Sequence, residues 1–378
     1  MTAPCARRCG WLSDTHLHTT RGNGEALRPL PLSRGLSISF AYSGRLTWTE
    51  EQTLDLVRPD PPAPADTARP RHGRARRVIS VAGGKGGIGK SYVAANLAIA
   101  LARRGRKVVL IDADMGAPNL HTWLGLAPPR RNLSDFLDRT VARIEDLIVP
   151  TGFPECGLIC GASDRLRAAA PLSGERMRLL RDIHDMDVDD AILDVGAGTH
   201  SNPLDLFLLA DNGILVLVPE PIAIENTYTF MKAAFWRRVN NVVSVYGLDE
   251  VLAQVMGDGE LANPVDVVAA LAARDPEAGQ FMRRQLERFQ PWLIVNQART
   301  PQDALLGDSA VAMWRKSFGL EMRYLGHVQH DEELWRRVRV RRPLTQQAPS
   351  EPSAQSFSRI ADRLASLPPP LARRRTAP

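Results

Sequence analysis

The chain has 378 residues, enough for two average domains or one large α/β domain, and its four cysteines are too few for a disulfide framework. Because it has neither a run of about 18 apolar residues nor the charged-then-apolar order of a signal peptide, we expect a cytoplasmic protein with no integral membrane segment. Residues 79–340 carry a net charge of −4, while the segments before and after them are each +5, which argues against bulk DNA binding by the central part.

Residues 1–76 are rich in Pro and Arg, which predicts a disordered N-terminal extension. From residue 77 to residue 367, apolar strand patterns alternate with helical patterns. This order predicts an α/β fold, a mostly parallel, doubly wound sheet with helices on both faces. Within it, residues 248–290 are predicted to be a helical insertion, and residues 368–378 form a basic, Pro-rich tail.

A glycine-rich loop follows the first strand pattern, Val78–Ala82, and precedes the helical pattern Tyr92–Ala102. Its sequence from Gly84 to Ser91 satisfies the phosphate-loop pattern G-x-x-x-x-G-K-[ST], and its members are Gly84, Lys85, Gly86, Gly87, Ile88, Gly89, Lys90 and Ser91. The glycines let the backbone approach phosphate oxygens closely. We therefore predict ATP binding, with Lys90 on the β/γ-phosphates and Ser91 on Mg²⁺.

Acidic residues end two later strand patterns. Lys107–Ile111 leads into Asp112 and Asp114, and Asp190–Leu193 leads into Asp194. Carboxylates beside a phosphate loop would repel the bound phosphates, so their presence is explained only if a cation or a reacting water interacts with them. We therefore assign Asp112 and Asp194, with Ser91, to Mg²⁺, and Asp194 is the acid expected to hold the ion through water.

Taken together, these motifs resemble the MinD/ParA family of P-loop ATPases with a deviant Walker A loop. The resemblance rests on GGKGGIGKS, on Asp114-Met-Gly-Ala-Pro-Asn-Leu120 and on Asp194-Val-Gly-Ala-Gly198. Within this family, the run Pro219–Asn226 of the chain looks most like the MinD-like and FlhG-like members, which regulate division-site or flagellar placement.

The resemblance implies roles for single residues. Lys85 would be the signature lysine that crosses an ATP-dependent homodimer and contacts the partner's phosphates, and Asp114 would orient the attacking water. Asn119 would lie near the nucleotide, and Asn296 would read adenine. Gly196 and Gly198 would give switch II room to move when the γ-phosphate is lost.

We therefore expect an ATPase that dimerises, hydrolyses ATP slowly and controls spatial positioning. We also expect it to bind a regulatory protein partner. A DNA-partitioning ATPase stays open as an alternative, as does a peripheral membrane contact through the helical pattern that carries Phe357, Ile360 and Leu364. For that helix, packing against the sheet is the favoured interpretation. An iron–sulfur carrier would need cysteine pairs, and this chain has none after Asp194. A tyrosine kinase of related fold would need a tyrosine-rich tail, which this chain also lacks.

Overall fold

The computed structural model describes residue 75 and residues 77–115, 117–161, 173–247, 249–256, 264–334 and 351–367. The predicted N-terminal extension, apart from Ala75, and the tail at 368–378 lie outside the described residues.

Within these described ranges, eight strands form one sheet in the order β3-β4-β2-β5-β1-β6-β7-β8. The pair β3 and β4 is antiparallel and the other neighbours are parallel, which confirms the predicted mostly parallel sheet. Strands β1, β2 and β5 are buried at every position, as expected for mainly apolar strands of a parallel sheet that is covered on both faces. The strands are β1 (Arg77–Ala82), β2 (Val108–Ala113), β3 (Val149–Pro150), β4 (Cys156–Ile159), β5 (Asp190–Val195), β6 (Asn212–Leu217), β7 (Trp292–Ala298) and β8 (Arg323–Gln329).

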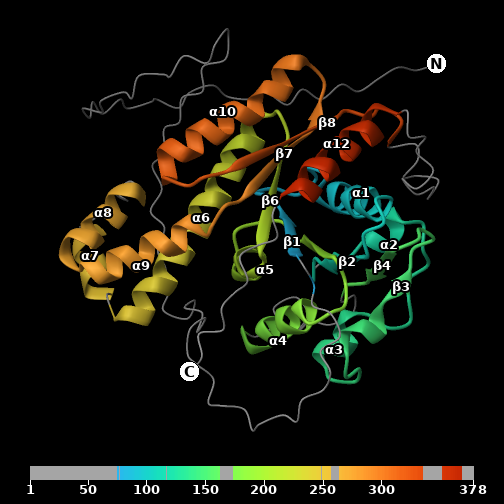
Figure 1. Cartoon of the computed structure of the whole chain (residues 1–378), viewed down its shortest axis with the longest axis horizontal. Coiled ribbons are helices and arrows are strands. Elements are labelled where there is room, and N and C mark those ends of the chain that lie inside the picture. The colour runs from blue at the N-terminus through green and yellow to red at the C-terminus, as the bar shows by residue number, and fades with distance from the viewer. Residues whose placement is uncertain are drawn as a thin grey trace, which may run out of the picture. The chain divides into compact units, whose positions relative to one another are not determined.

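Helices cover both faces of the sheet (Figure 1). On one face, α1 (Lys90–Ala102) packs on the central strands and α12 (Pro352–Ser366) packs on α1 and β8. The other face carries α5 (Ser201–Leu209), α6 (Pro221–Tyr246) and α10 (Pro301–Phe318). Successive side chains of β1 point to opposite faces of the sheet. Ile79 and Val81 join the core under α1, whereas the Ser80 hydroxyl donates to the Phe207 carbonyl of α5 on the other face.

The remaining helices are shorter or peripheral. They are α2 (Leu120–Trp123), α3 (Leu133–Leu137), a 3₁₀ turn (Ile144–Leu147), α4 (Ser173–His184), α7 (Asp249–Met256), α8 (Pro264–Arg274) and α9 (Pro276–Glu287). Helices α7 to α9 occupy the described part of residues 248–290 and pack on α6 and α10. This region is helical as predicted, and its origin as an insertion stays a prediction.

Helix α12 buries the apolar side that its sequence predicted. Phe357, Ile360 and Leu364 are buried, and the Phe357 ring packs edge-on against Tyr92 of α1 with centroids 5.4 Å apart. The expectation that this helix packs onto the domain is therefore confirmed. Across the described ranges, no helix combines the length and apolarity that crossing a membrane requires.

The parallel strands direct their carboxyl ends to one edge of the sheet, where ligands of open α/β folds bind. Strands β5 and β6 flank β1, so the loops after these three strands are neighbours. The glycine-rich loop, the acids after β2 and β5, and the end of β7 all meet at this edge.

Candidate nucleotide site

Gly84, Gly87 and Gly89 of the phosphate loop each have a physical reason to be glycine. A Cβ on Gly84 would lie 2.1 Å from the carbonyl oxygen of Asn226 in α6, so close packing requires glycine there. Gly87 and Gly89 have φ angles of +81° and +88°, which other residues rarely adopt. Added Cβ atoms on Gly86 and Gly87 would meet nothing within 4 Å, so the centre of the loop is open. An anion can approach the backbone at this open centre.

Helix α1 begins directly after the loop, at Lys90. Its N-cap, Gly89, offers no side-chain hydrogen bond, and its first turn holds no acidic residue. The first N–H groups of a helix have no partner within the helix, and they carry the positive end of its dipole. This uncapped end is suited to bind phosphate.

The two lysines of the loop occupy different environments. Lys90 is buried, with its Nζ donating to the Lys85 carbonyl oxygen at 3.4 Å, whereas the Lys85 side chain is exposed. Burial lowers the pKa of Lys90, and the negative charges of Asp194 and Asp114 partly oppose that shift. One lysine thus lies inside the loop, and the other is free to contact a second molecule.

Asp112 is buried at the end of β2, where its carboxylate accepts backbone N–H groups. Asn119 and Leu120 donate to one oxygen at 2.8 and 3.0 Å, and Asp114 donates to the other at 3.3 Å. Burial nevertheless raises the pKa of Asp112 to about 7. The carboxylate therefore fixes the loop that leads into α2, a role that the sequence did not predict, and its assignment to Mg²⁺ stays a prediction.

Asp194 ends β5 beside Asp112, its register partner on β2. The Ser91 side chain lies beside its carboxylate, whose Oδ1 is buried without a hydrogen-bond partner in the described part of the chain. Burial, with the Asp112 charge next, raises the pKa of Asp194 to about 8. A buried, unsatisfied carboxylate oxygen next to a serine hydroxyl and a second carboxylate fits a divalent cation with oxygen ligands. The residues present therefore suit Mg²⁺.

Asp114 follows β2 and lies against the predicted switch II segment. Its Oδ1 accepts the Ala117 N–H at 3.2 Å, and a Cβ on Gly196 would lie 3.1 Å from the same oxygen. Gly198 has φ +103°, and a Cβ there would approach the His200 ring nitrogen to 3.2 Å. Glycine at 196 thus makes room for the Asp114 carboxylate, so the segments that follow β2 and β5 are in contact.

The two predicted asparagines differ in position. Asn119 is exposed at the start of α2, and its amide donates to the Ala117 carbonyl at 3.2 Å. Asn296 is buried near the end of β7, and its amide donates to the Ile88 carbonyl of the phosphate loop at 2.8 Å. Asn296 therefore supports the loop. Its predicted contact with adenine is not tested by this geometry.

Sequence reasoning missed one part of the site. The backbone of Asn226 and Thr227, in the first turns of α6, forms the wall against which Gly84 packs. The run Pro219–Asn226 signalled a resemblance, but it carried no residue-level role because a backbone contact leaves no side-chain signature.

Comparison with known proteins agrees with this geometry. Residues 79–365 match the family described as the CobQ/CobB/MinD/ParA nucleotide binding domain. The chain belongs to this family. The MinD/ParA resemblance drawn from the motifs is therefore confirmed, and with it the nucleotide-binding nature of the family.

Individual members of the CobQ/CobB/MinD/ParA family are similar over different lengths. The chain is 26% identical over 296 residues to the antiactivator FleN of Pseudomonas aeruginosa, covering 78% of this chain and 88% of FleN. It is 25% identical over 292 residues to the flagellum site-determining protein YlxH of Helicobacter pylori, covering 77% and 82%. Similarity to the septum site-determining protein MinD of Synechocystis is 35% over 151 residues, which is 40% of this chain and 56% of that MinD.

Among solved structures, MinD from Pyrococcus horikoshii, complexed with Mg-ADP, shares the fold of this CobQ/CobB/MinD/ParA member. The TM-score is 0.53 at 21% identity, over 77% of this chain and 96% of that one. This likeness confirms the predicted fold class.

Proposed function

We propose that this protein is an ATP-dependent switch of the MinD/ParA kind, which binds ATP and Mg²⁺, dimerises, and hydrolyses ATP slowly. The observation that carries the proposal is the division of the loop lysines, Lys90 buried within the phosphate loop and Lys85 exposed beside it. A nucleotide site that served one chain alone would need the buried lysine only. An exposed lysine next to the open loop centre is suited to contact phosphates bound by a second copy.

Within this proposal the described residues divide the chemistry. The loop backbone and Lys90 would bind the phosphates, and Ser91, Asp112 and Asp194 would hold Mg²⁺, which would neutralise phosphate charge. Asp114 orients the attacking water. The contact between Asp114 and Gly196 supports this role, because it joins the carboxylate to the segment proposed to respond to the γ-phosphate.

The proposed process is spatial positioning of a cellular cargo, such as flagella, the division site or another polar structure. FleN and YlxH support it because the similarity spans most of both proteins. FleN is named an antiactivator, which supports a regulatory protein partner for this chain too. The second candidate function is DNA partitioning through a ParA-like contact with DNA. For its location we propose the cytoplasm, with peripheral binding to the inner face of the membrane as a further proposal.

The cysteines give little support to the alternative of an iron–sulfur carrier. Cys156 and Cys160 are both buried, and burial raises the pKa values of their thiols to about 11 and about 12. Thiolates are the form that binds iron.

Calorimetric titration with ATP and Mg²⁺ tests the nucleotide site. Lys90→Ala should weaken ATP binding by about a hundredfold or more, because it removes a buried cation from the phosphates. Lys107→Ala is the matched control, since Lys107 is an exposed lysine that pairs with Asp187 at 3.0 Å, at the start of β2 and away from the loop. Equal ATP affinity for Lys90→Ala and Lys107→Ala would refute the proposal.

A further inference from the structure

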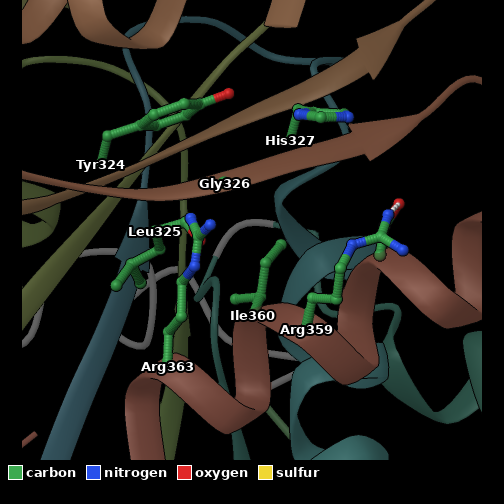
Figure 2. Close-up of a pocket in the computed structure, with 8 residues that line it drawn as sticks. Tyr324, Leu325, Gly326, His327, Arg359, Ile360 and Arg363 are labelled. Carbon is green, nitrogen blue, oxygen red and sulfur yellow. Dashed lines mark hydrogen bonds between the residues drawn. The ribbon is translucent and has the colours of Figure 1, made fainter.

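A small pocket lies between the edge strand β8 and helix α12. Figure 2 shows Arg359 and Arg363 extending from α12 toward β8, whose opposite side carries the rings of Tyr324 and His327. The two arginines are four residues apart, so they lie on the same side of the helix. None of the residues proposed for the nucleotide site belongs to β8 or α12, so this pocket is separate from that site.

The side chains that line the pocket are basic or neutral. Arg363 donates to the Leu325 carbonyl at 2.9 Å and Arg359 donates to the Ser356 hydroxyl at 3.1 Å, which leaves further N–H groups on each guanidinium. Neither arginine forms an ion pair with any residue that the structure describes. Two unneutralised guanidinium groups on one wall produce a positive potential.

The charges of the two arginines also act on His327. Burial, then the charges of Arg359 and Arg363, lower the pKa of His327. The neighbouring phenol of Tyr324 donates to the Ala304 carbonyl at 2.8 Å, and its pKa is raised to about 12 by burial and by Asp308 of α10. The charges acting on His327 are thus both positive, and a bound anion would relieve their repulsion.

The backbone of β8 is irregular at the point where Arg363 contacts it. The β7 and β8 register shifts between Leu293 and Ile294, which leaves Leu325 as an extra residue in β8. Next to it, Gly326 has φ +134°, and a Cβ there would lie 3.5 Å from the Arg363 Nη1. The positive φ favours glycine at 326, and the Arg363 hydrogen bond to the Leu325 carbonyl is made at the bulged residue itself.

We propose that the pocket between β8 and α12 binds a phosphate-type oxyanion. Its volume of about 110 Å³ is below the roughly 300–1,000 Å³ of pockets that hold whole organic ligands, so it suits a single anionic group. Guanidinium groups recognise phosphate through paired, charge-assisted hydrogen bonds.

The test uses the imidazole proton signals of the full chain, with the His327 signal assigned by its disappearance in His327→Gln. Inorganic phosphate is titrated at constant ionic strength. In the wild type it should raise the pKa of His327, because the bound anion offsets the charges of Arg359 and Arg363. Arg283→Gln, which removes an exposed arginine on α9, should respond like the wild type.

Arg359→Gln is the critical variant, since it removes one guanidinium and leaves the Arg363 contact with β8 in place. It should weaken the phosphate response of His327 by at least about tenfold. Lys90→Ala should keep the full response, so this test stands even if the nucleotide proposal fails. An unchanged response in Arg359→Gln, or no response in the wild type at phosphate concentrations that saturate ordinary anion sites, would overturn the inference.

Two further arms identify the source of the anion. Sedimentation with phosphatidylcholine vesicles that contain phosphatidic acid, abolished in Arg359→Gln, would show a lipid headgroup as the source. A phosphate response without sedimentation would show a soluble phosphate compound. Binding of a poly-glutamate peptide with no response to phosphate would contradict the inference, because it would show an acidic protein as the ligand.

Discussion

The side-chain amide of Asn296 donates a 2.8 Å hydrogen bond to the backbone carbonyl of Ile88, 208 residues earlier in the chain. The bond joins the end of β7 to the phosphate loop after β1, two strands away in the sheet. A Cβ on Gly89 would lie 2.3 Å from the same amide nitrogen. The loop conformation therefore depends on Asn296 as well as on its own glycines.

Asn296→Ala should lower both stability and nucleotide affinity. It leaves the buried Ile88 carbonyl without its partner, which costs about 1–3 kcal/mol. Thermal melting with and without ATP measures both effects, and Asn240→Ala on the half-buried side of α6 is the control. A variant that melts and binds ATP like the wild type would show that the loop holds its shape unaided.

Asp194→Asn should remove the dependence of nucleotide binding on Mg²⁺. The amide keeps the size of the side chain but loses the negative charge that a divalent cation requires. Calorimetry measures ADP affinity with and without Mg²⁺. Adding Mg²⁺ should raise the ADP affinity of the wild type and of the control Asp187→Asn, which changes an exposed aspartate paired with Lys107. The same gain in Asp194→Asn would remove this residue from the proposed metal site.

Deletion of residues 1–76 should leave folding and ATP binding intact, because the described sheet and helices run from Arg77 to Ser366. Among the described residues, the deletion removes the 3.1 Å hydrogen bond that the Ala75 N–H donates to the His184 carbonyl. Thermal melting of the shortened chain checks this domain boundary. A fall of ten degrees or more, roughly the effect of several kcal/mol in a domain of this size, would place part of the extension in the fold.

The sequence predicted the features that single segments encode. The buried parallel strands appear as continuous apolar runs, and the phosphate loop is recognisable because glycine, lysine and serine recur at fixed spacing. The two-residue strand β3 has no such pattern, since only its pairing with β4 defines it. Likewise, the Asn296 bond to Ile88 and the packing of Gly84 on Asn226 depend on strand order. The bulge at Leu325, which shapes the pocket beside α12, arises from register and not from composition.

Asp114→Ala should separate binding from turnover. A carboxylate that orients water acts mainly in the transition state, so its removal should slow hydrolysis by about two to four orders of magnitude while ATP still binds. Phosphate release under saturating ATP measures the rate. An Asp114→Ala protein that hydrolyses ATP as fast as the wild type would show that another group positions the water.

Static light scattering with ATP and Mg²⁺ on the wild type, Lys85→Ala and Asp114→Ala is the decisive measurement for the dimeric switch. We expect ATP to double the mass of the wild type and Asp114→Ala to accumulate as the ATP-bound dimer. Lys85→Ala should bind ATP through the loop backbone and Lys90, yet remain a monomer. A Lys85→Ala protein that dimerises with ATP as the wild type does would contradict the proposed role of the exposed lysine, and with it the assignment of this chain to the dimeric switch ATPases.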